Sequence, residues 1–241
     1  MNVLVIAAHP DDEVLGMGGT LKKLSKNGDK LKIVIMATGI SGRRSINYIN
    51  SSTYKVNEKT KKIMRKQIKK LRVDSKKAAK ILGINDIEFM DFPDNEMDII
   101  SNLEITKKIE EKITKFKPRV VYTHSPFDIN VDHRVLYNAT LTATRPLADS
   151  SVKQVISFEV PSSTEWFFPS KFSPTIFVNI EKELKAKLNA LAAYKDEVRK
   201  FPHPRSREGI EIIAKRWGTV SGFKAAEAFY LVRQLINGIE N

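Results

Sequence analysis

The sequence contains no cysteine among its 241 residues. This absence excludes a disulfide framework, a cysteine-ligated zinc finger, an iron–sulfur cluster and a cysteine nucleophile. The sequence also lacks any apolar stretch approaching the ~18 residues that a transmembrane helix needs. Its first residues, MNVLVIAAHPDDE, contain no charged segment followed by an uninterrupted apolar run, which a secretory signal requires. We therefore expect a soluble, cytoplasmic protein without a transmembrane segment.

Acidic residues are fewer than basic ones, 28 against 41, which gives a formal net charge of +13. Most of the excess lies between Lys55 and Lys80, where twelve basic residues are opposed only by Glu58 and Asp74. We interpret this segment first as the solvated face of an amphipathic helix. The alternative is a basic rim that attracts a phosphorylated substrate or anionic lipid headgroups. The segment contains no aromatic residue, which argues against binding of single-stranded nucleic acid.

Short apolar runs alternate with helical segments over the first two thirds of the chain, which predicts parallel strands joined by helices. The expected fold class is α/β, with a Rossmann-like, doubly wound and mostly parallel sheet. We expect one domain, with a sheet core up to about residue 160 and a mostly helical C-terminal elaboration over 161–241. The polar segment 39–57 is predicted to be a surface loop that forms an active-site flap. The expected strands are 3–8, 31–37, 87–90, 119–123 and 152–160. The expected helices are 18–28, the basic segment up to 83, 103–116, 131–144 and, after 177–180, the segments 181–200, 207–216 and 224–237.

Histidine and carboxylate side chains follow two of the expected strands. His9, Asp11 and Asp12 come after the first strand, and His124 and His133 follow the strand 119–123. Ligands of open α/β sheets bind at the carboxyl ends of the strands. The two segments contain three of the four histidines of the chain, so we expect the chemistry of the protein to take place there.

Imidazole and carboxylate groups together suit zinc and related divalent ions, and a catalytic zinc needs three protein ligands and an open position for water. His9 and Asp12 lie three residues apart where a strand turns into a helix, so both can reach one point. His133, near the start of another helix, can supply the third ligand. Asp11 projects differently, which leaves it free to act as a general base.

Two other interpretations of these segments remain open. The aspartates can cap the helix that follows, and a lone His133 can be structural. The segment GMGGTL partly matches the dinucleotide-binding pattern G-x-G-x-x-G, but Leu21 stands where the third glycine belongs. A pyrophosphate there would also meet Asp11, Asp12 and Glu13 at close range, which disfavours this interpretation.

HPDDE (9–13), GMGGT (16–20) and DINVDH (128–133) together resemble the LmbE-like, or PIG-L-like, zinc-dependent N-deacetylases. The resemblance continues through RVDSKKAAKILGI, FPDN, EVPSSTEW, HPRS and AEAF, and so covers most of the chain. It implies His9, Asp12 and His133 as zinc ligands and Asp11 as general base and acid. It further implies that Arg72 and Asp94 contact sugar hydroxyls.

Two positions depart from the family pattern. The family's Arg-x-x-Glu is replaced here by Arg72-Val73-Asp74-Ser75. Asn130 stands where the family often has a histidine that helps to stabilise the tetrahedral intermediate. Asn130 can donate a hydrogen bond there, and His124 and His203 are candidate substitutes. Asp132 is expected either to orient His133 or a neighbouring histidine, or to cap the helix 131–144.

The resulting hypothesis is a zinc-dependent hydrolase that removes the N-acetyl group from a GlcNAc-type amino sugar and releases acetate. The expected cofactor is one Zn²⁺ per chain, although other divalent ions suit the same ligands. The expected partner is a small amino-sugar substrate, which the basic segment suggests is phosphorylated; no nucleic acid is expected, and a homo-oligomer is compatible with the resemblance. Two alternatives remain: a hydrolase of a non-sugar acylated amine, and a non-catalytic basic protein that binds nucleic acid or an anionic surface.

Overall fold

A seven-stranded sheet forms the centre of the protein in the computed structural model, which describes residues 1–40, 42 and 57–236. The strand order is β3-β2-β1-β4-β5-β7-β6; β1 to β5 run parallel to one another, whereas β7 is antiparallel to both β5 and β6. The predicted α/β class with a doubly wound, mostly parallel sheet is thereby confirmed. The strands are β1 (Asn2–Ala7), β2 (Lys30–Ala37), β3 (Asp86–Phe92), β4 (Val120–His124), β5 (Gln154–Phe158), β6 (Ile176–Asn179) and β7 (Ala226–Gln234).

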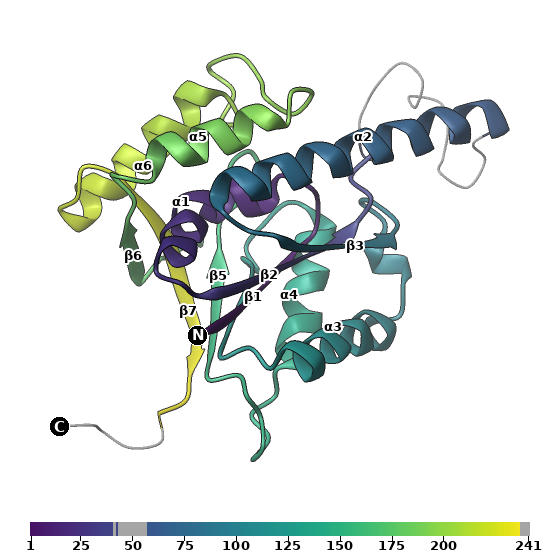
Figure 1. Ribbon diagram of the computed structural model, residues 1–241, viewed down its shortest axis with the longest axis horizontal. Coiled ribbons are helices and arrows are strands. Elements are labelled where there is room, and N and C mark those ends of the chain that lie inside the picture. Colours follow the sequence, from purple (N-terminus) through teal and green to yellow (C-terminus); the bar gives the residue numbers. More distant parts are fainter. Residues whose placement is uncertain (41, 43–56, 237–241) are drawn as a thin grey trace.

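Helices cover both faces of this sheet (Figure 1). One face packs against α1, α2 and α5, and the opposite face packs against α3 and α4. None of the helices in the described part of the chain is both long and apolar enough to cross a membrane. The helices are α1 (Asp12–Lys26), α2 (Glu58–Leu82), α3 (Asn102–Phe116), α4 (Val131–Ala143), α5 (Leu184–Ala193) and α6 (Arg207–Ser221), with a short 3₁₀ turn, η2, at Met97–Ile99.

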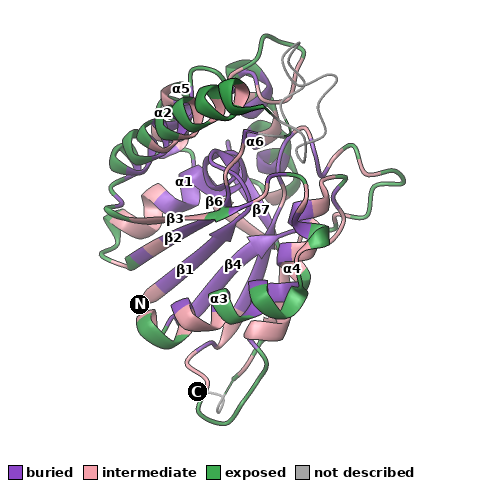
Figure 2. Cartoon of the chain, turned by 90° about the vertical axis from the view of Figure 1, so that its right-hand side faces the viewer, coloured by how far each residue is buried: buried purple, intermediate pink, exposed green. Residues whose placement is uncertain are grey.

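The central strands are buried on both sides, as Figure 2 shows for β1 and β4. Val3, Val5 and Ala7 of β1 point to the face with α1, while Leu4 and Ile6 point to the face with α4. Successive side chains of a strand alternate between faces, so a strand covered twice must be apolar throughout. This requirement explains the continuous apolar run at the start of the sequence.

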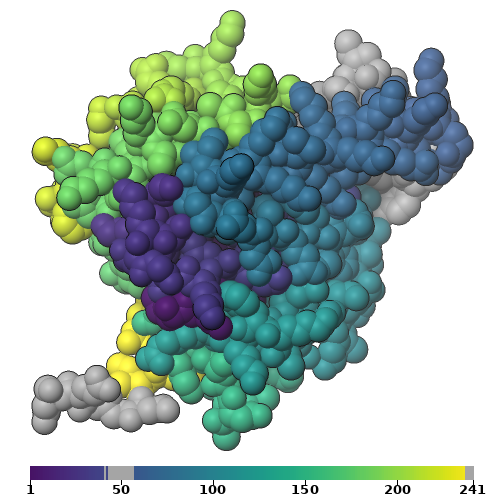
Figure 3. Space-filling model, in the orientation of Figure 1, coloured from purple at the N-terminus to yellow at the C-terminus, as the bar shows by residue number. Residues whose placement is uncertain are grey.

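The basic segment forms α2, as predicted, and its apolar face packs on the sheet through Leu71, Ala78 and Leu82. Apart from the half-buried Arg72, the basic side chains of this helix are exposed along its outer side. Figure 3 shows α2 as a surface ridge beside the C-terminal third of the chain. Lys55 and nearly all of the predicted flap 39–57 lie outside the described residues.

Two expectations for secondary structure were wrong. The segment 224–237 is mainly the strand β7, because it lies between β5 and β6 and forms antiparallel ladders with both. Those ladders satisfy its backbone hydrogen bonds, and this tertiary pairing outweighs the local helical pattern. The second error concerns α1, which starts at Asp12 and not at the glycines 18 and 19.

The glycines of the GMGGT segment allow close packing of α1. A Cβ atom at Gly16 would lie 2.7 Å from the carbonyl oxygen of Glu159, and one at Gly19 would lie 2.8 Å from Ile180 Cβ. These glycines thus have a packing role that requires no bound phosphate. The dinucleotide-binding interpretation is therefore not supported, because these glycines are explained by the close contact between α1 and the end of the sheet.

A buried ion pair joins three distant elements at this contact. α1 has a non-helical residue, Met17, and the backbone amides that follow it donate to Glu227 of β7, from Gly19 N at 2.9 Å and Thr20 N at 2.6 Å. Lys187 of α5 donates to the same carboxylate at 2.6 Å. It also donates to the carbonyl oxygen of Leu15 at 2.8 Å. Glu227 therefore satisfies amides that the kink leaves without helical partners.

We predict that Lys187→Met destabilises the protein by about 3–5 kcal/mol, because it leaves the Glu227 carboxylate buried without its counter-ion. Urea unfolding measures the change in the free energy of unfolding. Lys185→Met, on the exposed side of the same helix, is the control and should stay within about 0.5 kcal/mol of the wild type. A loss below about 1 kcal/mol for Lys187→Met would show that the ion pair is not important for stability.

Candidate active site

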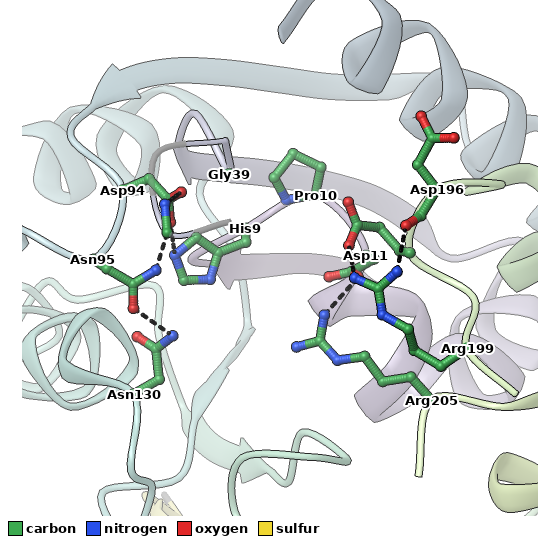
Figure 4. A pocket seen from close by; sticks show the side chains of 12 residues that line it. His9, Pro10, Asp11, Gly39, Asp94, Asn95, Asn130, Asp196, Arg199 and Arg205 are labelled. Carbon is green, nitrogen blue, oxygen red and sulfur yellow. Dashed lines mark hydrogen bonds and ion pairs between the residues drawn. The ribbon is translucent and has the colours of Figure 1, made fainter. Parts of the chain in front are cut away.

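A cavity of about 470 Å³ opens at the carboxyl ends of β1, β3 and β4. Figure 4 shows His9 between two groups of polar side chains. One group is Asp94, Asn95 and Asn130, and the other is formed by Asp11 with residues of the C-terminal third. The two predicted polar segments thus meet at one edge of the sheet, together with two further segments. The lining residues are His9, Pro10, Asp11, Gly39, Gly42, Asp94, Asn95, Asn130, Asp196, Glu197, Arg199 and Arg205.

Three buried side chains beside the cavity have the composition of a zinc site. One ligand atom from each of His9, Asp12 and His133 lies within 4.8 Å of the other two. Asp12 Oδ1 and His133 Nε2 are buried and have no hydrogen-bond partner among the described residues. A buried polar atom without a partner is costly, and a bound cation would satisfy both of these atoms. Two imidazoles and one carboxylate also leave a position open for water on a four-coordinate ion.

A second group, His9, Asp94 and Asp132, is equally compact but its oxygens already have partners. Asp132 accepts from Met97 N at 3.0 Å and from Asn95 N at 2.7 Å. His9 Nε2 lies 2.9 Å from Asp132 Oδ2 and 3.0 Å from Asp94 Oδ1. These carboxylates therefore orient His9 and leave its Nδ1, 3.2 Å from Asp12 Oδ2, directed at the first group.

His133 is held from behind by Asp128. Its Nδ1 lies 3.0 Å from Asp128 Oδ2, and that carboxylate also accepts from Asn130 N at 2.8 Å and from Thr164 Oγ1 at 2.7 Å. Burial lowers the pKa of His133, but the charges of Asp128 and Asp12 outweigh it and raise the pKa to about 9. The carboxylate–histidine pair thus fixes the ring with Nε2 facing the ligand group.

Asp11 has an unusual backbone conformation that directs its side chain away from α1. Its φ is 112°, and although Asp11 occupies the N-cap position of α1, its side chain forms no capping hydrogen bond in the described structure. The Glu13 carboxylate supports this conformation by accepting from Asp11 N at 3.1 Å and from the Tyr194 hydroxyl at 2.5 Å. A left-handed backbone at a non-glycine residue is costly and is typical of functional positions.

Arg205 lies against Asp11 and was not among the residues predicted for the site. Its Nη1 donates to Asp11 Oδ2 at 3.0 Å, and its Nε donates to Ser162 Oγ at 2.6 Å. Burial raises the pKa of Asp11 well above its usual range; the Arg205 guanidinium opposes this, and the neighbouring Asp12 and Glu197 carboxylates add to it. The only sequence signal for Arg205 was its place in HPRS, within the loop between α5 and α6.

The remaining predicted residues occupy different environments. Asn130 lines the cavity, accepts from Asp132 N at 2.9 Å and donates to Asn95 at 3.1 Å. It is therefore Asn130, and not Asp132, that caps α4. Asp94 also lines the cavity and accepts from Gly42 N at 2.7 Å.

Arg72, His124 and His203 are absent from the described residues that line the cavity. Arg72 donates to Asp91 at 2.6 Å, and His203 Nδ1 accepts from Arg205 N at 3.1 Å. His124 is fully buried, accepts from Ala8 N at 2.8 Å and stacks on His133 at a ring distance of 3.9 Å. Burial and the neighbouring His133 lower its pKa well below the usual range, so His124 is neutral and supports the His133 ring from beneath. The expectation that His124 contacts substrate gains no support from this position.

The family model for PIG-L, described as GlcNAc-PI de-N-acetylase, matches residues 4–144, which is more than half of the chain. The protein belongs to this family of deacetylases, as the resemblance indicated.

Individual relatives of the chain are also named as deacetylases. The chain is 30% identical over 201 residues to an uncharacterized deacetylase, YaiS, of Escherichia coli, covering 80% of this chain and 90% of that protein. It is 26% identical to the diacetylchitobiose deacetylase of Thermococcus kodakarensis, covering 95% of this chain and 82% of the relative. Among solved structures, the N,N'-diacetylchitobiose deacetylase of Pyrococcus horikoshii has the same fold, with a TM-score of 0.75 at 22% identity, covering 96% of this chain and 84% of that one.

Substitutions in the two compact groups should have opposite effects on zinc binding. Asp12→Asn should abolish stoichiometric zinc binding, because it removes the carboxylate whose oxygen has no other partner. Asp94→Asn, whose oxygens are already hydrogen-bonded, should retain about one zinc per chain. Metal content after dialysis, measured by atomic spectroscopy, distinguishes them. Loss of zinc in Asp94→Asn with retention in Asp12→Asn would place the ion in the second group.

Zinc binding should release a proton from His133. The raised pKa keeps this imidazole protonated in the metal-free protein below about pH 9, and zinc needs its neutral form. The apparent affinity should therefore increase as the pH rises from 7 towards 9, by up to about tenfold per unit for this group. Calorimetry in buffers of different ionisation enthalpy counts the released protons. Affinity that stays constant over this range, with no proton release, would contradict the protonated state of His133.

Proposed function

We propose that this protein is a zinc-dependent deacetylase that removes the acetyl group from an N-acetylated amino sugar. The observation that carries the proposal is the arrangement of Asp11 beside the group His9, Asp12 and His133. Two atoms of that group have no hydrogen-bond partner among the described residues and would be satisfied by a cation, while Asp11 faces the cavity and belongs to neither ligand group. A base placed next to a metal site, but not in it, is the arrangement that amide hydrolysis by water requires.

The bound ion would supply a Lewis acid that polarises the acetyl carbonyl and acidifies water. Asp11 accepts the proton of the attacking water on its carboxylate and later donates it to the departing amine nitrogen. Its raised pKa suits both steps, because a carboxylate with an ordinary pKa is a poor proton acceptor near neutral pH. Arg205 holds Asp11 Oδ2, which leaves Oδ1 for the water. Asn130, whose side-chain amide lies on the opposite wall, can donate to the substrate.

Two observations support a sugar as the proposed substrate: the polar groups in the walls of the cavity and the names of the relatives. Asp94, Asn95 and Asn130 provide carboxylate and amide groups of the kind that bind sugar hydroxyls. Relatives of this chain carry the names "Diacetylchitobiose deacetylase" and "Probable N-acetyl-alpha-D-glucosaminyl L-malate deacetylase 2". Phosphorylation of the substrate stays a prediction, since the exposed lysines of α2 are equally explained as a solvated face.

The proposal is tested with zinc-loaded protein and N,N'-diacetylchitobiose, by measuring acetate release and free amine. Asp11→Asn should retain its zinc and lose roughly 10²–10⁴ in kcat, because the proton acceptor is removed while the ligands remain. Glu211→Gln, at a half-exposed carboxylate on α6 that pairs with Lys215, is the control and should match the wild type.

Full activity of metal-loaded Asp11→Asn would refute the assignment of the base. Acetate release from non-sugar acetylated amines but not from N-acetylated sugars would favour the alternative amide hydrolase. Absence of both activities in the zinc-loaded protein, with salt-sensitive binding to long oligonucleotides, would instead favour the basic binding protein.

A further inference from the structure

The proposed general base, Asp11, is held from the connection between α5 and α6. Tyr194 begins this connection as the C-terminal cap residue of α5, and Arg205 lies near its end, two residues before α6. Arg205 donates to the Asp11 carboxylate. Tyr194 reaches Asp11 from the main-chain side, because its hydroxyl donates at 2.5 Å to the Glu13 carboxylate that accepts from Asp11 N. One short connection therefore holds the side chain of Asp11 directly and its main chain through Glu13.

The main chain of Asp11 needs this support. Its φ of 112° and ψ of −26° lie where residues other than glycine are strained. Its carbonyl oxygen is fixed at the start of α1, since it accepts from Val14 N at 3.0 Å and from Leu15 N at 2.9 Å. Its N–H group donates at 3.1 Å to Glu13 Oε2. The Glu13 carboxylate is therefore the partner that holds the Asp11 amide in this conformation.

Glu13 is in turn placed by Tyr194. Glu13 is 1% exposed, and Tyr194 is fully buried in the apolar core. A buried carboxylate needs hydrogen-bond donors for its oxygens. Asp11 N serves Oε2 and the Tyr194 hydroxyl serves Oε1, so the hydroxyl fixes the orientation of the carboxylate. Without that hydroxyl the carboxylate would be free to turn, and the Asp11 amide would lose its fixed acceptor.

We propose that Tyr194 is a positioning residue for the general base: through Glu13 it holds the main chain of Asp11 in the conformation that directs the carboxylate to the cavity. Tyr194 is absent from the described residues that line the cavity and belongs to neither ligand group. It therefore acts on the reaction only through Asp11. This inference rests on the proposed function of Asp11 and adds a residue that touches neither substrate nor ion.

The first test is a double-mutant cycle with zinc-loaded protein and N,N'-diacetylchitobiose. Tyr194→Phe keeps the ring in the core and removes only the hydroxyl. It should lower kcat about 10- to 100-fold, because small displacements of a catalytic group have effects of this size. KM and zinc content should stay within about twofold of the wild type, since no substrate contact or ligand is removed. In the Asp11→Asn background the same substitution should change kcat by less than about twofold, because the group that it positions is already lost.

Tyr122→Phe is the matched control for removal of a buried hydroxyl. Tyr122 of β4 is buried in the same core as Tyr194, and among the described residues it forms no hydrogen bond with Asp11 or Glu13. Its substitution should leave kcat unchanged. Equal losses of kcat for Tyr194→Phe in the wild-type and Asp11→Asn backgrounds would show a merely structural effect and overturn the proposal. An unchanged kcat in Tyr194→Phe, or loss of its zinc, would overturn it as well.

A second measurement reports on the hydrogen bond without enzymatic activity. Labelling with ¹⁵N-aspartate makes the Asp11 amide visible by NMR, and its signal is identified by its absence from Asp11→Asn. In Tyr194→Phe this amide should exchange with solvent at least about tenfold faster than in the wild type, since its acceptor is no longer fixed. In Tyr122→Phe the exchange should match the wild type.

Amide exchange also separates failure of this inference from failure of the proposed function. If the zinc-loaded wild type releases no acetate, the deacetylase proposal fails, and exchange of the Asp11 amide alone decides whether Tyr194 positions Asp11. Unchanged exchange in Tyr194→Phe would overturn the positioning role, and faster exchange would support it.

Discussion

The site depends on the fully buried carboxylate of Asp12, where the turn after β1 meets the start of α4. Its Oδ2 accepts from His9 N at 2.8 Å and lies 3.2 Å from both His9 Nδ1 and His133 Nε2. Its other oxygen has no partner in the described structure. The paired charges of the two histidines outweigh burial and hold the pKa of Asp12 well below its usual range. The carboxylate therefore stays ionised and draws both imidazoles towards one point.

Each imidazole is in turn held by a carboxylate on its far side. Asp132 orients His9 and Asp128 orients His133, while the hydroxyls and amides around these aspartates satisfy their remaining oxygens. Buried charges are costly unless they are paired and hydrogen-bonded, so this arrangement is stable only as a whole. Asp11 stands outside it, separated from the ligand group by its backbone conformation and held by Arg205. That separation would allow Asp11 to act as the proposed general base beside a cation without binding it.

Most of the sheet followed from local sequence. The strands β1 to β5 and the helices α2, α3 and α4 were predicted close to their observed bounds, because apolar periodicity and glycine or proline boundaries are local properties. The error at β7 has a physical cause. Its apolar and polar residues are compatible with either a helix or a strand, and only its position between β5 and β6 supplies the partners that make it a strand.

The sequence by itself determined the chemistry of the candidate site: the spacing of His9, Asp11 and Asp12 after a buried strand, and His133 at the start of a helix, indicated three ligands and a separate base. Only the tertiary structure decided which side chains support them. Arg205 reaches Asp11 across 194 residues of sequence, and His124 lies beneath His133 and away from the cavity. Contacts of this kind depend on how the elements pack and leave no local pattern, because charge pairing and ring stacking act through space and not along the chain.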